Sequence, residues 1–259
     1  MSVSSIHPLA SIDPSAELGE GVEVGPFTVI GPHVRIGARS VLHPHAVIMG
    51  HTRIAEECEV FPFACVGMQS QDLKFHGEET AIEVGARTTI REYVTINGGT
   101  GEGSRTVVGE DCHLMTGCHI AHNVKVGNGV VLTNLATLGG EVVVEDGAVV
   151  GGLSGVHQFC RIGRMAYVGA HSKVTQDIPP YMLCDGHPAV VRTINKVGMQ
   201  RRGITSETMI LIQRAFRLLY RSGLSVPSAT SKIEEQYAGI PEIETLLDFI
   251  RASSRGISR

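Results

Sequence analysis

Three residues that could serve one reaction, His122, Gly140 and Gln158, follow one another at intervals of eighteen. An imidazole can act as a general base and remove the proton of an attacking hydroxyl. The backbone N–H of a glycine, which no Cβ obstructs, can donate a hydrogen bond to a developing oxyanion. A glutamine amide can orient a bound substrate. If residues eighteen apart lie side by side, these three predict a site for acyl transfer.

A six-residue repeat of aliphatic side chains would bring them side by side. From Ile6 to Val174 every sixth residue is Ile, Leu or Val, except at Asp72, Glu78 and Glu102. Neither a helix, with a period of ~3.6 residues, nor a strand, with a period of ~2, gives this spacing. It is typical of hexapeptide solenoids, in which three repeats complete one coil and neighbouring coils lie ~4.8 Å apart. The repeat therefore predicts a mainly β protein, a left-handed parallel β-helix.

The breaks in the repeat predict the organisation of the chain. Two polar, glycine-containing interruptions near residues 69–81 and 98–105 are expected to leave the coil as loops, where function concentrates. We expect the β-helix to span residues 1–183 and a C-terminal helical domain to span residues 184–259, with a linker at 185–188. Glycines that directly follow an aliphatic position are expected to help the chain turn; they are Gly19, Gly25, Gly31, Gly37, Gly127, Gly163 and Gly169.

The C-terminal part has a different pattern, with helices expected to begin near Ser206 and Pro241. Residues 190–259 contain eleven Lys or Arg and six Asp or Glu, whereas the whole chain carries a net charge of −4. A basic end on an acidic body predicts an anionic partner or substrate near that end. A solvated helical surface is the alternative.

The composition narrows the class of protein. The chain has 259 residues, 42% of them hydrophobic, which is enough to bury a substantial core. No apolar run is long enough to span a membrane, and the first residues lack a basic segment followed by an apolar one, so we expect a cytoplasmic protein. The absence of Trp and the few aromatic residues argue against a stacking surface for nucleic acid.

The cysteines have a structural explanation. Four of the six cysteines stand four residues after an aliphatic position, where other repeats carry small residues; they are Cys58, Cys112, Cys118 and Cys160. Small, packed free thiols are therefore expected. A zinc site is the competing interpretation of His119 and His122, as in the hexapeptide proteins that resemble carbonic anhydrase. Zinc there would need a third imidazole, and neither His113 nor His157 is eighteen residues from the pair, so no metal site is expected.

Several strings carry a resemblance to a known family. The chain resembles the UDP-N-acetylglucosamine 3-O-acyltransferases that begin lipid A synthesis, in the hexapeptide-repeat acyltransferase superfamily. The resemblance spans essentially the whole chain and rests on strings at residues 71–74, 119–122, 156–160, 176–181, 201–203, 220–223 and 255–257. It implies a homotrimer with active sites between adjacent subunits, the catalytic base at His122 and the oxyanion amide at Gly140.

The resemblance also implies the substrates. The donor would be a 3-hydroxyacyl chain on the phosphopantetheine of acyl carrier protein, an acidic protein, and no further cofactor is expected. His122 would deprotonate the 3-hydroxyl of UDP-N-acetylglucosamine, which then attacks the thioester directly. Family residues that contact the sugar nucleotide or position the donor correspond to Asp72, Lys74, His119, Gln158, Asn195 and Arg201.

Two departures concern the base. The family usually has Asp directly after the catalytic His, where this chain has Asn123, and many members have His where this chain has Glu141. Because residues 123 and 141 are eighteen apart, we hypothesise that Glu141 supplies the negative charge that Asn123 lacks. The alternative is that Glu141 is solvated and Asn123 suffices.

Further departures concern the substrates. Val197 replaces a family Glu, which weakens the transfer of nucleotide contacts to that stretch. Ala170 stands where the family varies the floor that limits acyl length, and its small side chain favours a medium to long chain. An acidic Glu141 would also suit a 3-amino sugar nucleotide and an amide product. A non-catalytic scaffold trimer and a metal-binding protein of the carbonic-anhydrase-like type are the alternatives from other classes.

Overall fold

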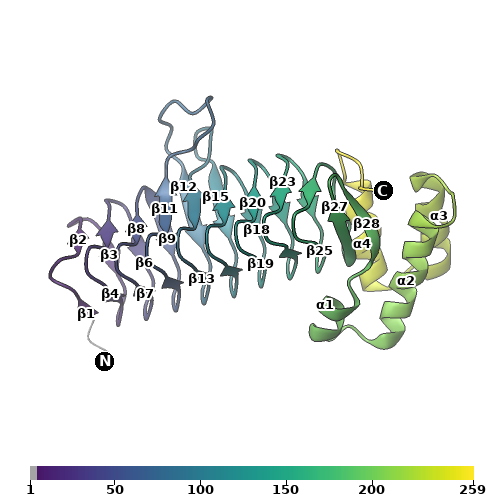
Figure 1. The fold of residues 1–259 in the computed structure, drawn as a ribbon, viewed down its shortest axis with the longest axis horizontal. Coiled ribbons are helices and arrows are strands. Elements are labelled where there is room, and N and C mark those ends of the chain that lie inside the picture. The colour runs from purple at the N-terminus through teal and green to yellow at the C-terminus, as the bar shows by residue number, and fades with distance from the viewer. Residues whose placement is uncertain (1–4) are drawn as a thin grey trace.

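The structure, a computed structural model, describes residues 5–259 and consists of a long parallel β-helix followed by helices (Figure 1). Its strands form three sheets, named A, B and C here. Sheet A contains β1 (Ser5–Ile6), β4 (Glu23–Val24), β7 (Val41–Leu42), β10 (Glu59–Val60), β13 (Thr89–Ile90), β16 (His113–Leu114), β19 (Val131–Leu132), β22 (Val149–Val150), β25 (Tyr167–Val168), β27 (Met182–Gly186) and β28 (Ala189–Ile194). Sheet B contains β2 (Ser11–Ile12), β5 (Val29–Ile30), β8 (Val47–Ile48), β11 (Cys65–Met68), β14 (Thr95–Asn97), β17 (His119–Ile120), β20 (Thr137–Leu138), β23 (Gly155–Val156) and β26 (Lys173–Val174). Sheet C contains β3 (Glu17–Leu18), β6 (Arg35–Ile36), β9 (His51–Ile54), β12 (Ala81–Val84), β15 (Arg105–Val108), β18 (Lys125–Val126), β21 (Val143–Val144) and β24 (Arg161–Ile162).

The strand register confirms the eighteen-residue coil. His119 pairs with Thr137, and Thr137 pairs with Gly155, each eighteen residues further on. The offset widens only where the loops leave the coil, because Cys65 pairs with Thr95 and Thr95 pairs with His119. Residues eighteen apart after the loops are therefore neighbours on adjacent coils.

The aliphatic positions fill the interior of the coil. Ile48, Leu114 and Leu138 are fully buried, as are most members of the repeat. The predicted free thiols are also confirmed, since all four of those cysteines are buried and unpaired. Burial raises the pKa of Cys58, and likewise of Cys118, to about 11. The core is thus a column of alternating large aliphatic and small side chains, without charge.

Each coil turns at three corners, named AB, BC and CA after the sheets they join. The third residue after the aliphatic position has a left-handed backbone, with φ of 61° at Phe27 on corner AB and 60° at Asn123 on corner BC. The glycines expected to help the turn have a different role. Gly37 is not left-handed, and a Cβ there would lie 2.4 Å from the backbone of Ala55 on the next coil. Glycine is therefore needed at these positions because neighbouring coils approach closely there, and not because the backbone has a positive φ.

Two loops project together from the coil (Figure 1). The flanking strands leave residues 69–80 and 98–104 outside the sheets, against the expected 69–81 and 98–105. The loops bind one another, because the N–H of Gly103 donates to the carbonyl of Glu79 at 3.0 Å. Gly101 N–H also donates to Glu78 Oε1 at 3.2 Å.

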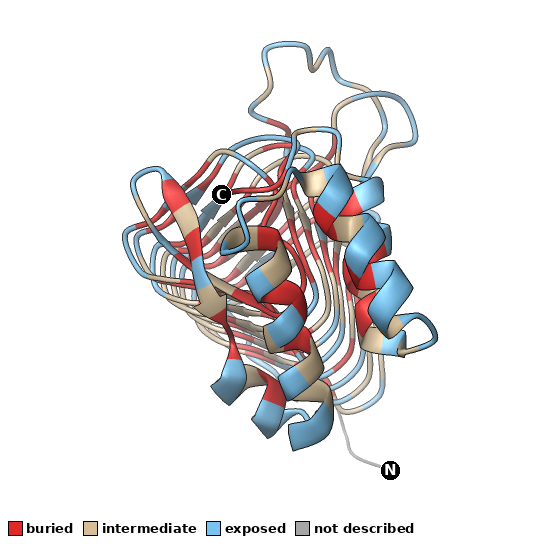
Figure 2. Cartoon of the chain, turned by 90° about the vertical axis from the view of Figure 1, so that its right-hand side faces the viewer, coloured by how far each residue is buried: buried red, intermediate tan, exposed pale blue. Residues whose placement is uncertain are grey.

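The C-terminal residues cover the last coil (Figure 2). The linker expected at 185–188 is wrong: these residues belong to an antiparallel hairpin of β27 and β28, which extends sheet A through β25. Alternating burial, with Met182 and Cys184 inside, keeps this segment in the sheet. Four helices follow, α1 (Lys196–Arg201), α2 (Ser206–Tyr220), α3 (Val226–Tyr237) and α4 (Pro241–Arg251). Across the described residues no helix has the length and apolar character needed to cross a membrane.

Candidate active site

The predicted column lies on corner BC. A Cβ at Gly140 would lie 2.2 Å from Nε2 of His122, so the imidazole rests on the bare face of this glycine. The backbone continues the column, since Phe159 N–H donates to Gly140 O at 3.0 Å. The N–H of Gly140 itself donates to no group within residues 5–259, which leaves it free for a ligand. Gln158 is exposed on the next coil.

The amide of Asn123 fixes which nitrogen of His122 is protonated. Its Oδ1 accepts from the N–H of Thr100 at 2.8 Å, and its Nδ2 donates to the carbonyl of Thr100 at 3.2 Å. These two hydrogen bonds identify which end of the Asn123 amide is the oxygen and which is the nitrogen. Oδ1 also lies 2.9 Å from His122 Nδ1, which must therefore carry the proton. The lone pair of the neutral ring is then on Nε2, beside Gly140.

One carboxylate approaches Nε2. Asp72 Oδ2, from the loop at residues 69–80, lies 3.8 Å away, and the His122 side chain is only 18% exposed. In such a partly buried place a carboxylate stabilises an imidazolium more than it would in water. The same Asp72 accepts the N–H of Lys74 at 3.0 Å through Oδ1, while the Lys74 side chain is exposed. The structure thus brings a loop residue of the predicted set close to His122.

His119 lies on β17, the strand that leads into the corner with His122. Its Nδ1 lies 2.7 Å from Thr95 Oγ1. Burial lowers the pKa of His119 below its ordinary value of 6.5, so the ring is neutral at neutral pH. This imidazole offers a neutral hydrogen-bonding edge next to the base.

Glu141 does not approach His122 within this chain. Its side chain is exposed and makes no hydrogen bond or ion pair with any described residue. Asn123 already binds the imidazole, and Asp72 supplies the nearby charge. Of the two interpretations of Glu141, the geometry favours the solvated one, and its electrostatic role stays a hypothesis.

The remaining candidates are not brought to His122 within one chain. Asn195 is 6% exposed and caps α1, where its Oδ1 accepts from Gly198 N–H at 3.0 Å. Its Nδ2 donates to Met165 O at 2.8 Å, on corner CA, so α1 with the exposed Arg201 lies at a different corner from the base. Ala170 is exposed at corner AB.

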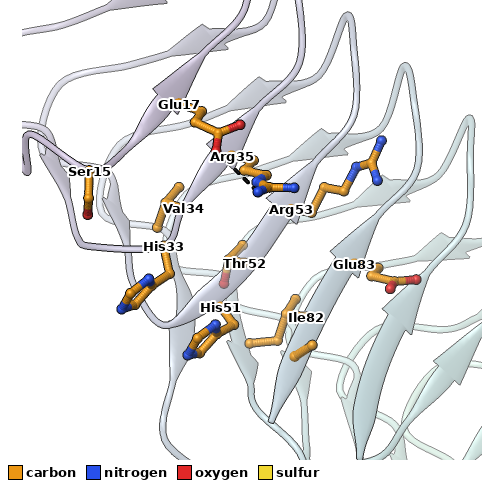
Figure 3. Close-up of a pocket in the computed structure, with 11 residues that line it drawn as sticks. Ser15, Glu17, His33, Val34, Arg35, His51, Thr52, Arg53, Ile82 and Glu83 are labelled. Atoms are coloured by element: carbon orange, nitrogen blue, oxygen red, sulfur yellow. Dashed lines mark ion pairs between the residues drawn. The ribbon is translucent and has the colours of Figure 1, made fainter. Parts of the chain in front are cut away.

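A separate hollow of about 300 Å³ lies on the N-terminal coils (Figure 3). The imidazoles of His33 and His51 stack there with centroids 4.6 Å apart, and Arg35 pairs with Glu17 at 3.1 Å. This hollow contains none of the predicted site residues. Among residues 5–259, no cluster of three or more His, Cys, Asp or Glu side chains could hold a metal ion.

Sequence reasoning missed Thr95, Ser70 and Thr100. Thr95 binds His119, and Thr100 binds Asn123. Ser70 and Thr100 lie in the two loops, whose residues have no register in the repeat. Because the loops interrupt the eighteen-residue spacing, the neighbours of these residues on adjacent coils could not be calculated from the sequence.

Family models match both the β-helix and the C-terminal part of the chain. A family model described as UDP N-acetylglucosamine O-acyltransferase, domain 2, matches residues 177–258, and the bacterial transferase hexapeptide model matches residues 15–50 and 105–140. The chain is 43% identical, over 82% of its length and 83% of the relative, to the acyl-(acyl-carrier-protein)–UDP-N-acetylglucosamine O-acyltransferase of Verminephrobacter eiseniae.

Solved structures give the same result. LpxA from Acinetobacter baumannii is 40% identical with a TM-score of 0.95, and covers 98% of this chain and 99% of its own. LpxA from Bacteroides fragilis, a UDP-N-acetylglucosamine acyltransferase, is 41% identical with a TM-score of 0.96, and covers 98% of this chain and 100% of its own. These likenesses confirm the predicted fold class. The chain belongs to the acyl-(acyl-carrier-protein)–UDP-N-acetylglucosamine O-acyltransferase family.

Proposed function

We propose that this chain transfers a 3-hydroxyacyl group from acyl carrier protein to the 3-hydroxyl of UDP-N-acetylglucosamine. One observation carries the proposal: the unprotonated Nε2 of His122 packs on Gly140 where a Cβ would stand, and the N–H of the same glycine has no hydrogen-bond partner among the described residues. A base and an oxyanion donor side by side are what acyl transfer to a hydroxyl requires. Family membership supplies the identity of donor and acceptor.

The reaction proceeds without a covalent enzyme intermediate. The sugar 3-hydroxyl oxygen attacks the thioester carbon while its proton passes to Nε2 of His122. The N–H of Gly140 donates to the oxyanion, and Asn123 keeps the Nδ1 proton in place. The carboxylate of Asp72 stabilises the imidazolium. When the tetrahedral intermediate collapses, the C–S bond breaks and the imidazolium returns the proton to the phosphopantetheine sulfur. The products are the 3-O-acyl sugar nucleotide and the free carrier thiol.

The acidic carrier binds at the C-terminal helices. A groove of about 440 Å³ on α2 has an apolar floor that includes Met209 and Ile210. Its rim carries the cations Lys196, Arg214 and Arg217. An apolar floor with a basic rim complements an acidic protein that presents a few apolar side chains. Its three cations belong to the basic excess of residues 190–259.

The chain assembles as a homotrimer about corner AB. Six exposed apolar side chains, each between 45% and 59% exposed, lie along this single corner: Leu9, Phe27, Phe63, Tyr93, Leu135 and Leu153. A straight apolar stripe parallel to the coil axis fits burial at a rotational symmetry axis. The same assembly would let the base of one subunit meet α1 of the next.

The remaining candidates serve the sugar nucleotide and the acyl chain. The cations Lys74 and Arg201, both exposed, bind the diphosphate. His119 and Gln158 orient the sugar from one coil before and one coil beyond Gly140. Asn195 holds α1 in place through its cap, and Ala170 forms the floor beneath the acyl chain.

Product analysis tests this function. Purified protein is incubated with UDP-N-acetylglucosamine and a panel of 3-hydroxyacyl carrier proteins, and products are read by mass spectrometry. We expect an alkali-labile ester, which His122→Ala reduces to near background. The control is His33→Ala, an exposed imidazole on the same corner, and it should retain wild-type turnover. If the protein forms no ester but forms an alkali-stable amide from a 3-amino sugar nucleotide, the proposed acceptor is wrong. If His122→Ala keeps full activity, His122 is not the general base.

A further inference from the structure

The two loops and the base form a closed ring of contacts. The hydroxyls of Ser70 and Thr100 lie 2.7 Å apart and join one loop to the other. Ser70 Oγ also accepts the N–H of Asp72 at 3.1 Å, and Asp72 Oδ2 reaches His122 Nε2 at 3.8 Å. On the other side, Thr100 binds Asn123, which binds the same imidazole at Nδ1. Both nitrogens of His122 are thus linked to Thr100, Nδ1 through Asn123 and the Thr100 backbone, and Nε2 through Asp72, Ser70 and the Thr100 hydroxyl.

Burial of Ser70 makes its bond to Thr100 hard to replace by water. Ser70 is only 5% exposed although it lies in a loop. A buried hydroxyl that loses its partner has no solvent to replace the lost hydrogen bond. Two further hydrogen bonds join the two loops where they leave the coil. Asn97 Nδ2 donates to Gln69 O at 2.6 Å, and Gly98 N–H donates to Met68 O at 2.8 Å.

The amide of Asn123 suits this ring better than a carboxylate would. Its Nδ2 donates to the carbonyl of Thr100, a bond that an aspartate could not make. A carboxylate at this position would instead face that carbonyl oxygen. The departure from the family's usual Asp therefore has a local structural reason in the loop at residues 98–104.

We propose that the Ser70–Thr100 hydroxyl pair is a latch that positions the Asp72 carboxylate against His122, which makes Ser70 and Thr100 positioning residues for the reaction. This inference rests on the proposed function of His122. The latch acts through Asp72: it holds the charge where the imidazolium forms in the transition state. Interactions present in the transition state and absent in the ground state raise kcat.

Isosteric substitution of the latch tests the proposal. Thr100→Val removes the hydroxyl with little change in shape, and we expect it to lower kcat about tenfold. Thr100→Ser restores a hydroxyl and should recover most of the lost rate. The coil should remain folded in both variants, because both loops lie outside it, and circular dichroism checks this.

A double-mutant cycle separates the latch from a general structural effect. In an Asp72→Asn background, Thr100→Val should lower kcat less than about twofold, because the charge it positions is gone. Independent effects that multiply would overturn the proposal, as would wild-type kcat in Thr100→Val or a Thr100→Ser variant as slow as Thr100→Val. His122→Ala is assayed in parallel. If this variant keeps its activity, the proposed base is wrong. If it loses activity while Thr100→Val has wild-type kcat, only the latch is refuted.

Discussion

At the residue scale, the chemistry depends on which nitrogen of His122 is free. Asn123 Oδ1 holds Nδ1, and Nε2 faces Gly140. The repeat predicted the column, because positions eighteen apart in this part of the chain could be stacked by arithmetic. It could not predict that Asp72 reaches the imidazole, because this residue comes from a loop outside the register.

Substitution of Gly140 tests the packing of base on amide. In Gly140→Ala the new Cβ would lie 2.2 Å from Nε2, so the imidazole must move away from the reacting atoms. We expect kcat to fall by about 10²–10⁴, the usual contribution of a positioned general base. Steady-state assays against Gly155→Ala, where a Cβ meets nothing within 4 Å, provide the comparison. Equal activity of the two variants would mean that Gly140 is not at the reacting centre.

The buried imidazole of His119 predicts a pH dependence of stability. Its pKa is lowered by burial from 6.5, so below about pH 6.5 the unfolded chain takes up a proton that the folded chain resists. Stability is therefore present above this pH and falls as the pH drops towards the folded pKa. Urea unfolding at about pH 7.5 and about pH 5.5 should show a smaller loss for His119→Gln than for wild type. His33→Gln, at an exposed site, should behave as wild type; a loss in His119→Gln equal to the wild-type loss would count against the burial effect.

At the element scale, the repeat determined most of the fold. The coil length, the buried aliphatic column and the helix at Pro241 follow from spacing and composition. The hairpin of β27 and β28 was missed because Gly186 and Pro188 look like a linker in the sequence. Helix α3 was missed because only Ala229 and Ile233 are buried in it, too few to show a period.

The glycines between coils give a stability prediction. A Cβ at Gly37 would meet the backbone of the next coil at 2.4 Å, which no side-chain rotation can relieve. We expect Gly37→Ala to lower the free energy of unfolding by about 3 kcal/mol, in the range of overpacked cores. Chemical denaturation followed by circular dichroism measures this change. Gly155→Ala, with open space at the Cβ, should cost less than about 1 kcal/mol. If the two variants lose the same stability, close approach is not what requires glycine.

At the scale of the whole molecule, one chain does not bring together all the residues of the site that we propose. His122 lies at corner BC, whereas α1 with Arg201 is tied to Met165 at corner CA through Asn195. Two corners of one coil cannot meet, but the corners of neighbouring subunits can. The apolar stripe on corner AB lies where such neighbours would join. His122 and Arg201 could both be identified in the sequence. Only the arrangement of the three corners shows that they face away from each other in one chain.

Subunit complementation is the most direct test of a site shared between subunits. His122→Ala and Arg201→Ala are each expected to be nearly inactive alone, since each variant lacks one half of every site. Co-expressed with different tags and purified as mixed trimers, they should regain about a third of wild-type turnover, because each mixed trimer has one interface that pairs two intact halves. Mixed trimers that stay as inactive as either variant alone would contradict a shared site.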